Sequence, residues 1–390
     1  MADRYGQPSG GRGDDESTAL RSNIIQENDL VLTRLRAFLD DVRYREVDSD
    51  LSAAIASADC SPKFERLTQL IESIPQPRQT IFRLLRIGDA VDEESLREVF
   101  PSDIAIAMGR IGLLRQTTDG QWYANSLRIT AVKDLLIISS IPPKYPTARR
   151  QCRVWLDDAS MTVVEALPLD LSGRKVLDVC SGSGVLSLIA LSRGALHVVG
   201  LEIDREAVAV AQANAIINGF SKSSCFRVSD TLSALRHEEK FNFVVCNGPF
   251  RPMVRERPIE NPQDVGNAVL MRLIGRLNYH LAASVDGLLA IWNALGTESD
   301  GVITVYQAKE IERRLRASSV RCTFDIHESE NDPKSLLDRL AGDEYSAADD
   351  IRRSLSNLRL LLLKEPRRFR SLYDVLIRIK RRGRDCRNWV

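Results

Sequence analysis

The feature that most constrains the fold is the segment from Val176 to Gly184, which reads VLDVCSGSG. A strand-like apolar run leads into a turn rich in glycine and serine, and an apolar helix pattern begins near Val185. Glycines at 182 and 184 allow a sharp turn and let a ligand approach without a Cβ in the way. The free N–H groups at the start of the following helix suit a carboxylate or similar anion. This unit predicts an α/β fold with a ligand site at the end of a strand.

The chain beyond this unit continues to alternate strand and helix patterns. Strands are expected at 197–203, 225–230, 241–247, 288–293, 322–328 and 371–379, and helices at 205–220 and 265–281. Alternation of this kind is typical of a parallel sheet with crossover helices. The predicted fold class is therefore α/β, with a Rossmann-like, doubly wound domain.

The 390 residues suggest two folded domains. Between residues 19 and 145 the pattern is mainly helical, and three short helices ending at Gly112 precede extended stretches with a turn signal at Asp119-Gly120. This outline predicts a winged-helix-like N-terminal domain. The full expected division is a disordered tail at 1–18, this domain at 19–145, the α/β domain at 146–382 with a helical insertion at about 332–365, and a basic tail at 383–390.

Polar residues end four successive strands of the predicted sheet: Asp178, Glu202, Asp230 and Asn247. Open α/β sheets bind ligands at the carboxyl ends of their strands. A dinucleotide fingerprint would require glycine where Ser187 stands, and a P-loop is excluded by the missing G-K-[ST]. Glu202 lies 24 positions after Asp178, where a carboxylate can accept hydrogen bonds from both hydroxyls of a ribose. Asp230 is placed to contact an adenine amine, although it and Asp178 could each simply cap a helix.

This ordered set resembles the class I S-adenosylmethionine-dependent methyltransferases over about residues 169–293, and the strand near 373–379 completes the family's sheet. The resemblance implies that Asp178, Gly182 and Gly184 surround the methionine part of S-adenosylmethionine, that Glu202 holds the ribose, and that Asp230 flanks the adenine. Cys180 stands where the family usually has glycine, as in a variant seen in glutamine methyltransferases. Cys180 and Asn247 complete the expected cofactor-binding set. Asp158, Ser160 and Thr162 lie where related enzymes place cofactor contacts.

The segment Asn247-Gly248-Pro249-Phe250 is similar to the N-P-P-[YF] motif of amino-methyltransferases acting on glutamine amides or nucleobase amines. The Asn247 side-chain oxygen and the Gly248 carbonyl can each accept an N–H bond from a planar nitrogen and so orient its lone pair. Pro249 stiffens the turn, and Phe250 offers a flat face to the acceptor. These four residues are the candidate catalytic residues. The chain thus resembles the release-factor glutamine N-methyltransferases, and also actinobacterial proteins of that type with a different N-terminal domain.

Composition limits the remaining possibilities. The net charge is +1, although nine Lys or Arg lie between residues 366 and 390, which could contact nucleic acid or the ribosome. The seven cysteines show no zinc-ligand spacing, so no metal is expected. The sequence has neither an apolar signal core nor a run long enough to span a membrane, which favours a cytoplasmic bacterial protein.

Three functions remain open from the sequence. The leading one is N-methylation of a glutamine amide or nucleobase amine in a protein or RNA. A second is N-methylation of a small molecule in a biosynthetic pathway. The N-terminal domain, which differs from that of the release-factor enzymes, and the expected helical insertion favour this function. A third is a winged-helix nucleic-acid-binding protein whose cofactor domain is not catalytic.

Overall fold

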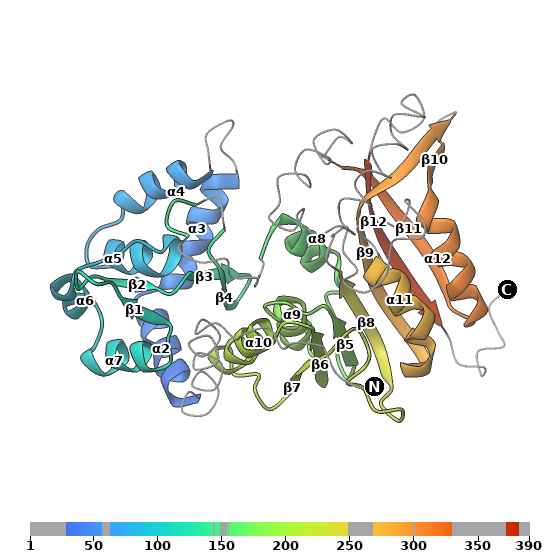
Figure 1. Cartoon of the computed structure of the whole chain (residues 1–390), viewed down its shortest axis with the longest axis horizontal. Helices are drawn as coiled ribbons and strands as arrows, with labels where there is room; N and C mark the ends of the chain where they lie inside the picture. Colours follow the sequence, from blue (N-terminus) through green and yellow to red (C-terminus); the bar gives the residue numbers. More distant parts are fainter. Residues whose placement is uncertain are drawn as a thin grey trace, which may run out of the picture. The chain divides into compact units, whose positions relative to one another are not determined.

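The computed structural model describes residues 29–56, 63–142, 145–148, 154, 156–248, 268–299, 302–329 and 372–381. The segments expected at 1–18, 332–365 and 383–390 lie outside these ranges. The chain divides into two compact units, one formed by Met1–Leu156 with Asp204–Lys222 and the other by Asp157–Ile203 with Ser223–Val390 (Figure 1). Among the described residues, no helix has both the length and the apolar character needed to cross a membrane.

The first unit is mainly helical, with two short antiparallel strand pairs. Its elements are α2 (Asp29–Asp41), α3 (Tyr44–Ala56), α4 (Lys63–Glu72), α5 (Arg78–Phe82), the π-helical turn η1 (Arg83–Ile87), α6 (Glu93–Val99), α7 (Ser102–Arg110), β1 (Leu114–Gln116), β2 (Trp122–Ala124), β3 (Leu127–Val132), β4 (Leu135–Ser140) and α10 (Arg205–Ile217). The three short helices and the turn at Asp119-Gly120 are present as expected. Each of the two extended stretches folds back on itself, as β1–β2 and as β3–β4.

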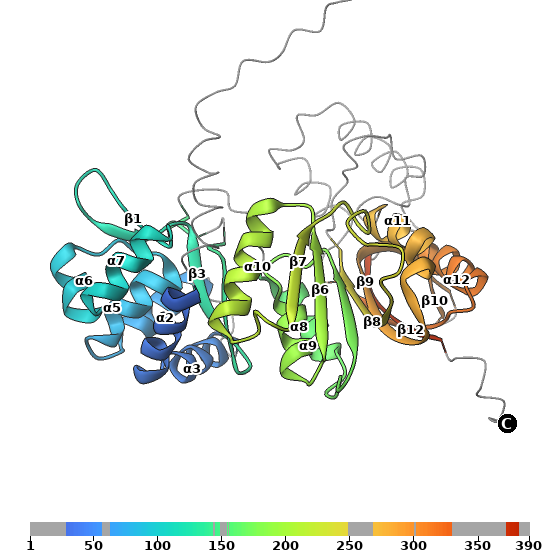
Figure 2. The same ribbon diagram turned by 90° about the horizontal axis from the view of Figure 1, so that it is seen from below.

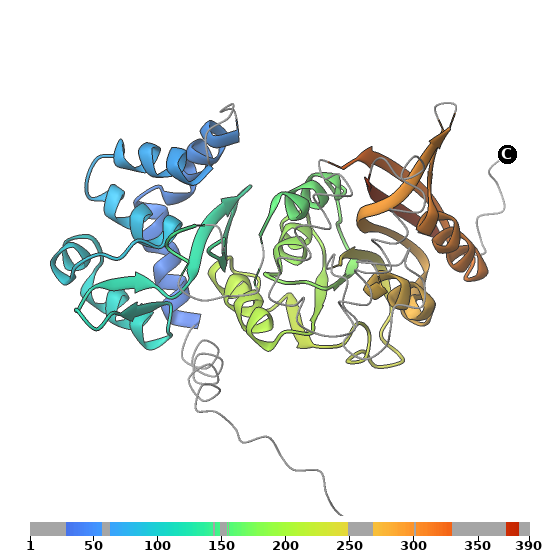
Figure 3. The ribbon, with the colours of Figure 1, turned by 45° about the horizontal axis from the view of Figure 1, so that its top comes forward.

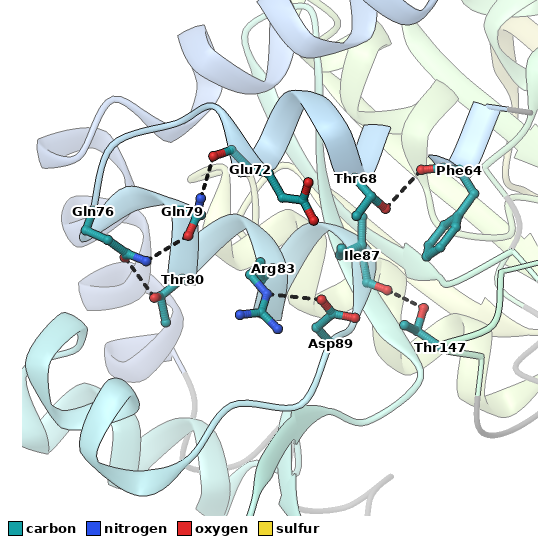
Figure 4. Close-up of polar contacts among 10 residues, drawn as sticks. All are labelled: Phe64, Thr68, Glu72, Gln76, Gln79, Thr80, Arg83, Ile87, Asp89 and Thr147. Atoms are coloured by element: carbon teal, nitrogen blue, oxygen red, sulfur yellow. Dashed lines mark hydrogen bonds and ion pairs between the residues drawn. The ribbon is translucent and has the colours of Figure 1, made fainter. Parts of the chain in front are cut away.

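Side-chain hydrogen bonds close the turn between α4 and α5 (Figure 4). The Gln79 amide donates to the Glu72 carbonyl at 2.7 Å, and the Gln76 amide donates to the Gln79 side-chain oxygen at 2.8 Å. The Thr80 hydroxyl donates to the Gln76 side-chain oxygen at 3.0 Å. The last carbonyls of a helix have no partner within the helix, and Gln79 satisfies one of them at the end of α4.

The crossover helix α10 belongs to the core of the first unit, although its residues lie within the segment that follows β6 in the chain. Its apolar residues share one hydrophobic cluster with those of α2, namely Ala207, Val210, Ala213 and Ile217 with Leu32, Leu35 and Leu39. The sequence did not predict this, because the helical pattern of 205–220 is equally compatible with packing on the α/β sheet alone.

Asn214 of α10 and Asn218, the C-cap residue of this helix, bind the backbone of β4. Buried Asn214 accepts a hydrogen bond from the Ile138 N–H at 2.7 Å and donates to the Ile138 carbonyl at 2.8 Å. Asn218, one helical turn later, binds the Leu136 N–H and carbonyl at 3.0 and 2.7 Å in the same manner. Residues four apart share a helix face and alternate strand residues share an edge. The helix therefore satisfies an edge that would otherwise expose unpaired backbone groups.

Replacing Asn214 with alanine should destabilise the protein by about 2–4 kcal/mol, because a buried N–H and a buried carbonyl both lose their partner. The free energy of unfolding from urea titration measures this. Arg205→Ala, at an exposed position of the same helix, is the matched control. A loss in Asn214→Ala no larger than that of the control would contradict the role given to Asn214.

The second unit is an open α/β sheet with helices on both faces. Its elements are α8 (Asp158–Ala166), β5 (Lys175–Val179), α9 (Val185–Ser192), β6 (His197–Glu202), β7 (Ser224–Val228), β8 (Phe241–Asn247), α11 (Ala268–Leu277), the 3₁₀ turn η3 (Asn278–His280), β9 (Leu281–Ser299), β10 (Val302–Val305), α12 (Tyr306–Ala317), β11 (Arg321–Glu328) and β12 (Leu372–Arg381). Figure 3 shows the end of β9 pairing with β10 beyond the rest of the sheet.

The strand order is β11-β12-β9-β8-β5-β6-β7. Strands β5, β6, β7, β8 and β9 run parallel to one another, and β12 is antiparallel to both β9 and β11. This is the mostly parallel, Rossmann-like sheet expected from the sequence, and the prediction of its fold class is confirmed. The sequence pattern did not identify β10 or α12.

Alternation along the strands separates the two faces of the sheet. Leu177 and Val179 of β5 lie in one hydrophobic cluster with residues of α11 and α12. Asp178, between them, is directed to the opposite face, where it binds α9 at Ser187. Helices α8 and α9 lie together on that face (Figure 2).

Candidate active site

The candidate site lies where the strand order reverses. From β5 the chain passes through α9 to β6 on one side, whereas β8 lies on the other side of β5. Such a reversal leaves a crevice outside the carboxyl ends of the two central strands, which is where open α/β sheets bind ligands. Val179 is paired in register with Cys246, so the turn beginning at Cys180 and the segment beginning at Asn247 leave the sheet side by side.

The turn after β5 has a backbone shape that glycine favours. Cys180, Gly182 and Gly184 have φ values of 63°, 52° and 77°. A Cβ added at Gly182 would meet no atom within 4 Å, so this part of the turn is open to a ligand. Gly184 is the N-cap of α9 and donates its N–H to the Ser181 carbonyl at 2.7 Å. Cys180 accepts the left-handed conformation despite its side chain, which costs roughly 1 kcal/mol or more.

Asp178 anchors this turn to α9. Its side chain is fully buried, and one carboxyl oxygen accepts hydrogen bonds from the Ser187 N–H and hydroxyl at 3.1 and 2.7 Å. Its other oxygen has no hydrogen-bond partner in the described part of the chain. Burial raises the pKa of Asp178 to about 7, the hydrogen bonds from Ser187 lower it, and the charge of Glu202 raises it. The helix-capping interpretation of Asp178 is thus observed, and an oxygen remains for a ligand.

The raised pKa of Asp178 makes stability depend on pH. The unfolded chain releases this proton near pH 3.8, whereas the folded protein holds it until about pH 7. The unfolded state therefore binds fewer protons between these values, and stability falls as the pH rises through them, by up to about 4 kcal/mol. Above pH 7 the loss is complete.

We expect Asp178→Asn to reduce this loss. The free energy of unfolding without cofactor, measured at pH 5 and pH 8, should differ less for Asp178→Asn than for the wild type. Glu165→Gln, at an exposed position, should keep the wild-type difference. An Asp178→Asn protein with the full wild-type difference would show that another group causes it.

Glu202 joins the end of β6 to the turn after β5. One carboxyl oxygen accepts the Gly182 N–H at 3.0 Å, and the other accepts the Ile203 N–H at 2.8 Å. The carboxylate thus fixes the turn after β5 to the end of β6, and its oxygens are the hydrogen-bond acceptors expected to face ligand hydroxyls. The structure thus brings together Glu202 and the glycine-rich turn, which the sequence predicted as parts of one site.

At the carboxyl-terminal edge of the sheet, apolar side chains and a second carboxylate lie near the ends of β6 and β7. Ile203 is 66% exposed and Val228 is 44% exposed, both directly at strand ends. The side chain of Asp230 is half exposed and forms an ion pair with Arg272 at 3.5 Å. Sequence reasoning missed Ile203, for which the signal was a large apolar residue immediately after the acidic end of a strand.

At the end of β8 the Asn247 side chain is held from both sides. Its oxygen accepts a hydrogen bond from the Trp292 indole N–H at 2.7 Å, and its amide N–H donates to the Ser160 hydroxyl at 3.4 Å. Gly248 follows at a half-buried position. Pro249 and Phe250, the other two candidate catalytic residues, lie outside the described residues.

The donor set fits a nucleoside carrying a positively charged group. Residues 178–187 contain no basic side chain that would neutralise a pyrophosphate. They offer the Asp178 oxygen and the Ser181 hydroxyl, both buried without a partner among the described residues, next to the carboxylate of Glu202. Within the same described ranges, no cluster of His, Cys, Asp and Glu could hold a metal ion. S-adenosylmethionine, with its sulfonium, ribose and adenine, matches this set.

Part of this chain is similar to known methyltransferases. Residues 151–275 match the family model of the methyltransferase small domain. The ribosomal protein L11 methyltransferase of Citrobacter koseri is 33% identical over 117 residues, which is 28% of this chain and 35% of that protein. The enzyme of the same name from Salmonella newport is 34% identical over 116 residues, with the same coverage. This chain thus spans about a third of the length of these relatives.

Two solved structures match this chain with low TM-scores. The ribosomal protein L11 methylase of Lactobacillus delbrueckii subsp. bulgaricus has a TM-score of 0.33 and 18% identity, covering 58% of this chain and 78% of that one. TYW2 of M. jannaschii, solved in complex with AdoMet, has a TM-score of 0.39 and 8% identity, covering 66% of this chain and 87% of that one. The match to this family model supports a methyltransferase domain that includes residues 151–275, with S-adenosylmethionine as its cofactor. The resemblance to release-factor glutamine methyltransferases stays a prediction.

Proposed function

We propose that this protein is a cytoplasmic N-methyltransferase that methylates an N–H group of a macromolecule, either a glutamine amide or a nucleobase amine. The observation that carries the proposal is the position of Asn247. It ends β8 beside the turn that follows β5, so a carboxamide lies next to the site that fits the cofactor. The names of the relatives, which are ribosomal protein methyltransferases, support a macromolecular acceptor.

The residues of the site would orient the acceptor and not deprotonate it. When bound, S-adenosylmethionine supplies an electrophilic methyl group. The lone pair of an amide or aryl amine is delocalised, so the nitrogen reacts only when it is aligned. The Asn247 oxygen and the Gly248 carbonyl would accept its N–H bonds, keep the lone pair directed at the methyl carbon, and stabilise the positive charge that develops on nitrogen. The proton is then lost to water from the more acidic product.

The first unit would bind the acceptor. Its helices α5–η1, α6 and α7 are followed by the β1–β2 pair, and Val91, before α6, forms an isolated bridge with Trp122 of β2. Three helices followed by a hairpin match the outline expected for a winged helix. The basic end of the chain supplies the positive charge that would favour a ribosomal or RNA partner.

The direct test is transfer of a radiolabelled methyl group. The full chain is incubated with S-adenosyl-[methyl-³H]methionine and, separately, with total ribosomal protein, with total RNA and with the small-molecule fraction of a lysate. Label in protein or RNA that S-adenosylhomocysteine suppresses supports the proposal. Label confined to small molecules favours a biosynthetic N-methyltransferase, and binding of cofactor without transfer to any fraction contradicts methylation by this chain.

A further inference from the structure

The Asn247 carboxamide has partners from two other elements of its unit. Trp292 lies on β9 and is 8% exposed, and Ser160 lies on α8 and is 7% exposed. Helix α8 contacts both β8 and β9, so the three side chains converge where these elements meet. Both Trp292 and Ser160 direct a polar atom at Asn247.

These partners allow only one orientation of the amide. An indole N–H is a donor only, so the atom that faces Trp292 at 2.7 Å must be the Asn247 oxygen. On the other side, the Ser160 hydroxyl donates its proton to the Asp157 carboxylate at 2.8 Å and presents a lone pair to the Asn247 amide N–H. Asp157 is itself held as the N-cap of α8, where it also accepts the Ser160 N–H. A flipped amide would place two donors against each other and leave the Ser160 lone pair unused.

We infer that Trp292 and Ser160 are positioning residues that hold the Asn247 oxygen as a hydrogen-bond acceptor, so that the site selects a methyl acceptor that carries an N–H. The inference rests on the role proposed for Asn247. After the bond from Trp292, the carboxamide oxygen retains one lone pair, which can accept one hydrogen bond from the substrate. An amide or exocyclic amine can supply it, whereas a ring nitrogen without hydrogen would set a lone pair against a lone pair.

The first test is Trp292→Phe, which removes the N–H and keeps an aromatic ring. The acceptor is the labelled fraction identified with the wild type. We expect kcat to fall about tenfold, as for loss of one hydrogen bond in the transition state, with the Kd of S-adenosylhomocysteine changed less than about twofold. In the Asn247→Ala background the same substitution should have no further effect, because the group it orients is gone.

The matched control is Ser192→Ala. The Ser192 hydroxyl donates to the Ile189 carbonyl at 2.9 Å in the last turn of α9, so this variant loses one side-chain hydrogen bond of the same unit away from the site. If both variants lost kcat in proportion to their loss of Tm, the effect would be one of stability and the inference would be overturned. The inference would also be overturned if Trp292→Phe lowered kcat equally in the wild type and in Asn247→Ala.

Two further readouts do not depend on the rate. The ¹H–¹⁵N resonance of the Trp292 indole, assigned by its absence in Trp292→Phe, should move upfield in Asn247→Ala, and an unmoved resonance overturns the inference whether or not any fraction takes up label. Mass spectrometry of the labelled product should place the methyl group on a nitrogen that carried hydrogen. A methyl group on a ring nitrogen without hydrogen would refute the selection while leaving methylation itself established.

Discussion

Asn247→Ala is expected to lower kcat about 10²-fold while changing the Kd of S-adenosylhomocysteine by less than about threefold. Misplacing a reacting group by about 1 Å costs about this much in rate, and alanine leaves the acceptor nitrogen without the side chain that would align it. The Glu202 and Gly182 contacts that would hold the cofactor do not involve Asn247. Tritium transfer to the acceptor fraction gives kcat, and calorimetry gives the Kd.

The control for this prediction is Asn242→Ala. Asn242 also lies on β8, and its side-chain oxygen accepts the Lys175 N–H at 2.7 Å at the opposite end of the strand. Its loss should lower Tm but not the kcat of the folded protein. If Asn247→Ala retained more than half of the wild-type kcat, Asn247 would not be the residue that orients the acceptor.

Glu202→Gln should weaken the binding of S-adenosylhomocysteine by about 1–3 kcal/mol, which is about a 5- to 150-fold increase in Kd. The amide replaces one acceptor oxygen by a donor and removes the negative charge. One of the bonds that Glu202 accepts, from Gly182 or from Ile203, therefore loses its acceptor together with one of the bonds expected from the ribose. For S-adenosylmethionine the loss should be at least as large, because its sulfonium is positively charged.

Glu238→Gln, at an exposed position of the same unit, provides the comparison for charge alone. We expect its Kd to match the wild type at physiological salt, since exposed charges are screened. Equal Kd values for Glu202→Gln and the wild type would remove Glu202 from the cofactor site. Asn247→Ala and Glu202→Gln thus distinguish the acceptor part of the proposed site from its cofactor part. Asn247→Ala should change kcat, and Glu202→Gln should change the Kd of the cofactor.

The local order of the α/β domain was predictable from the sequence. Strands β5, β6 and β8 are short, largely apolar runs; the glycine-rich turn follows β5 directly, and Glu202 is the last residue of β6. These signals lie within a few residues of each other, so periodicity and spacing were sufficient to predict the sheet class and the residues at its carboxyl edge. The roles given to the cofactor-binding and catalytic residues remain predictions for the variants above to test.

The contacts that orient the site became apparent only in the tertiary structure. Ser160 and Trp292 are 87 and 45 residues away from Asn247, and no periodic pattern links them. In the same way, Asn214 binds Ile138, 76 residues earlier, and so places α10 in the core of the first unit. The sequence alone determined the strands and the polar residues at their ends, because these depend on neighbours along the chain. The tertiary structure decided which distant donors and acceptors satisfy those residues, because a buried polar group must find its partner wherever the fold brings one within reach.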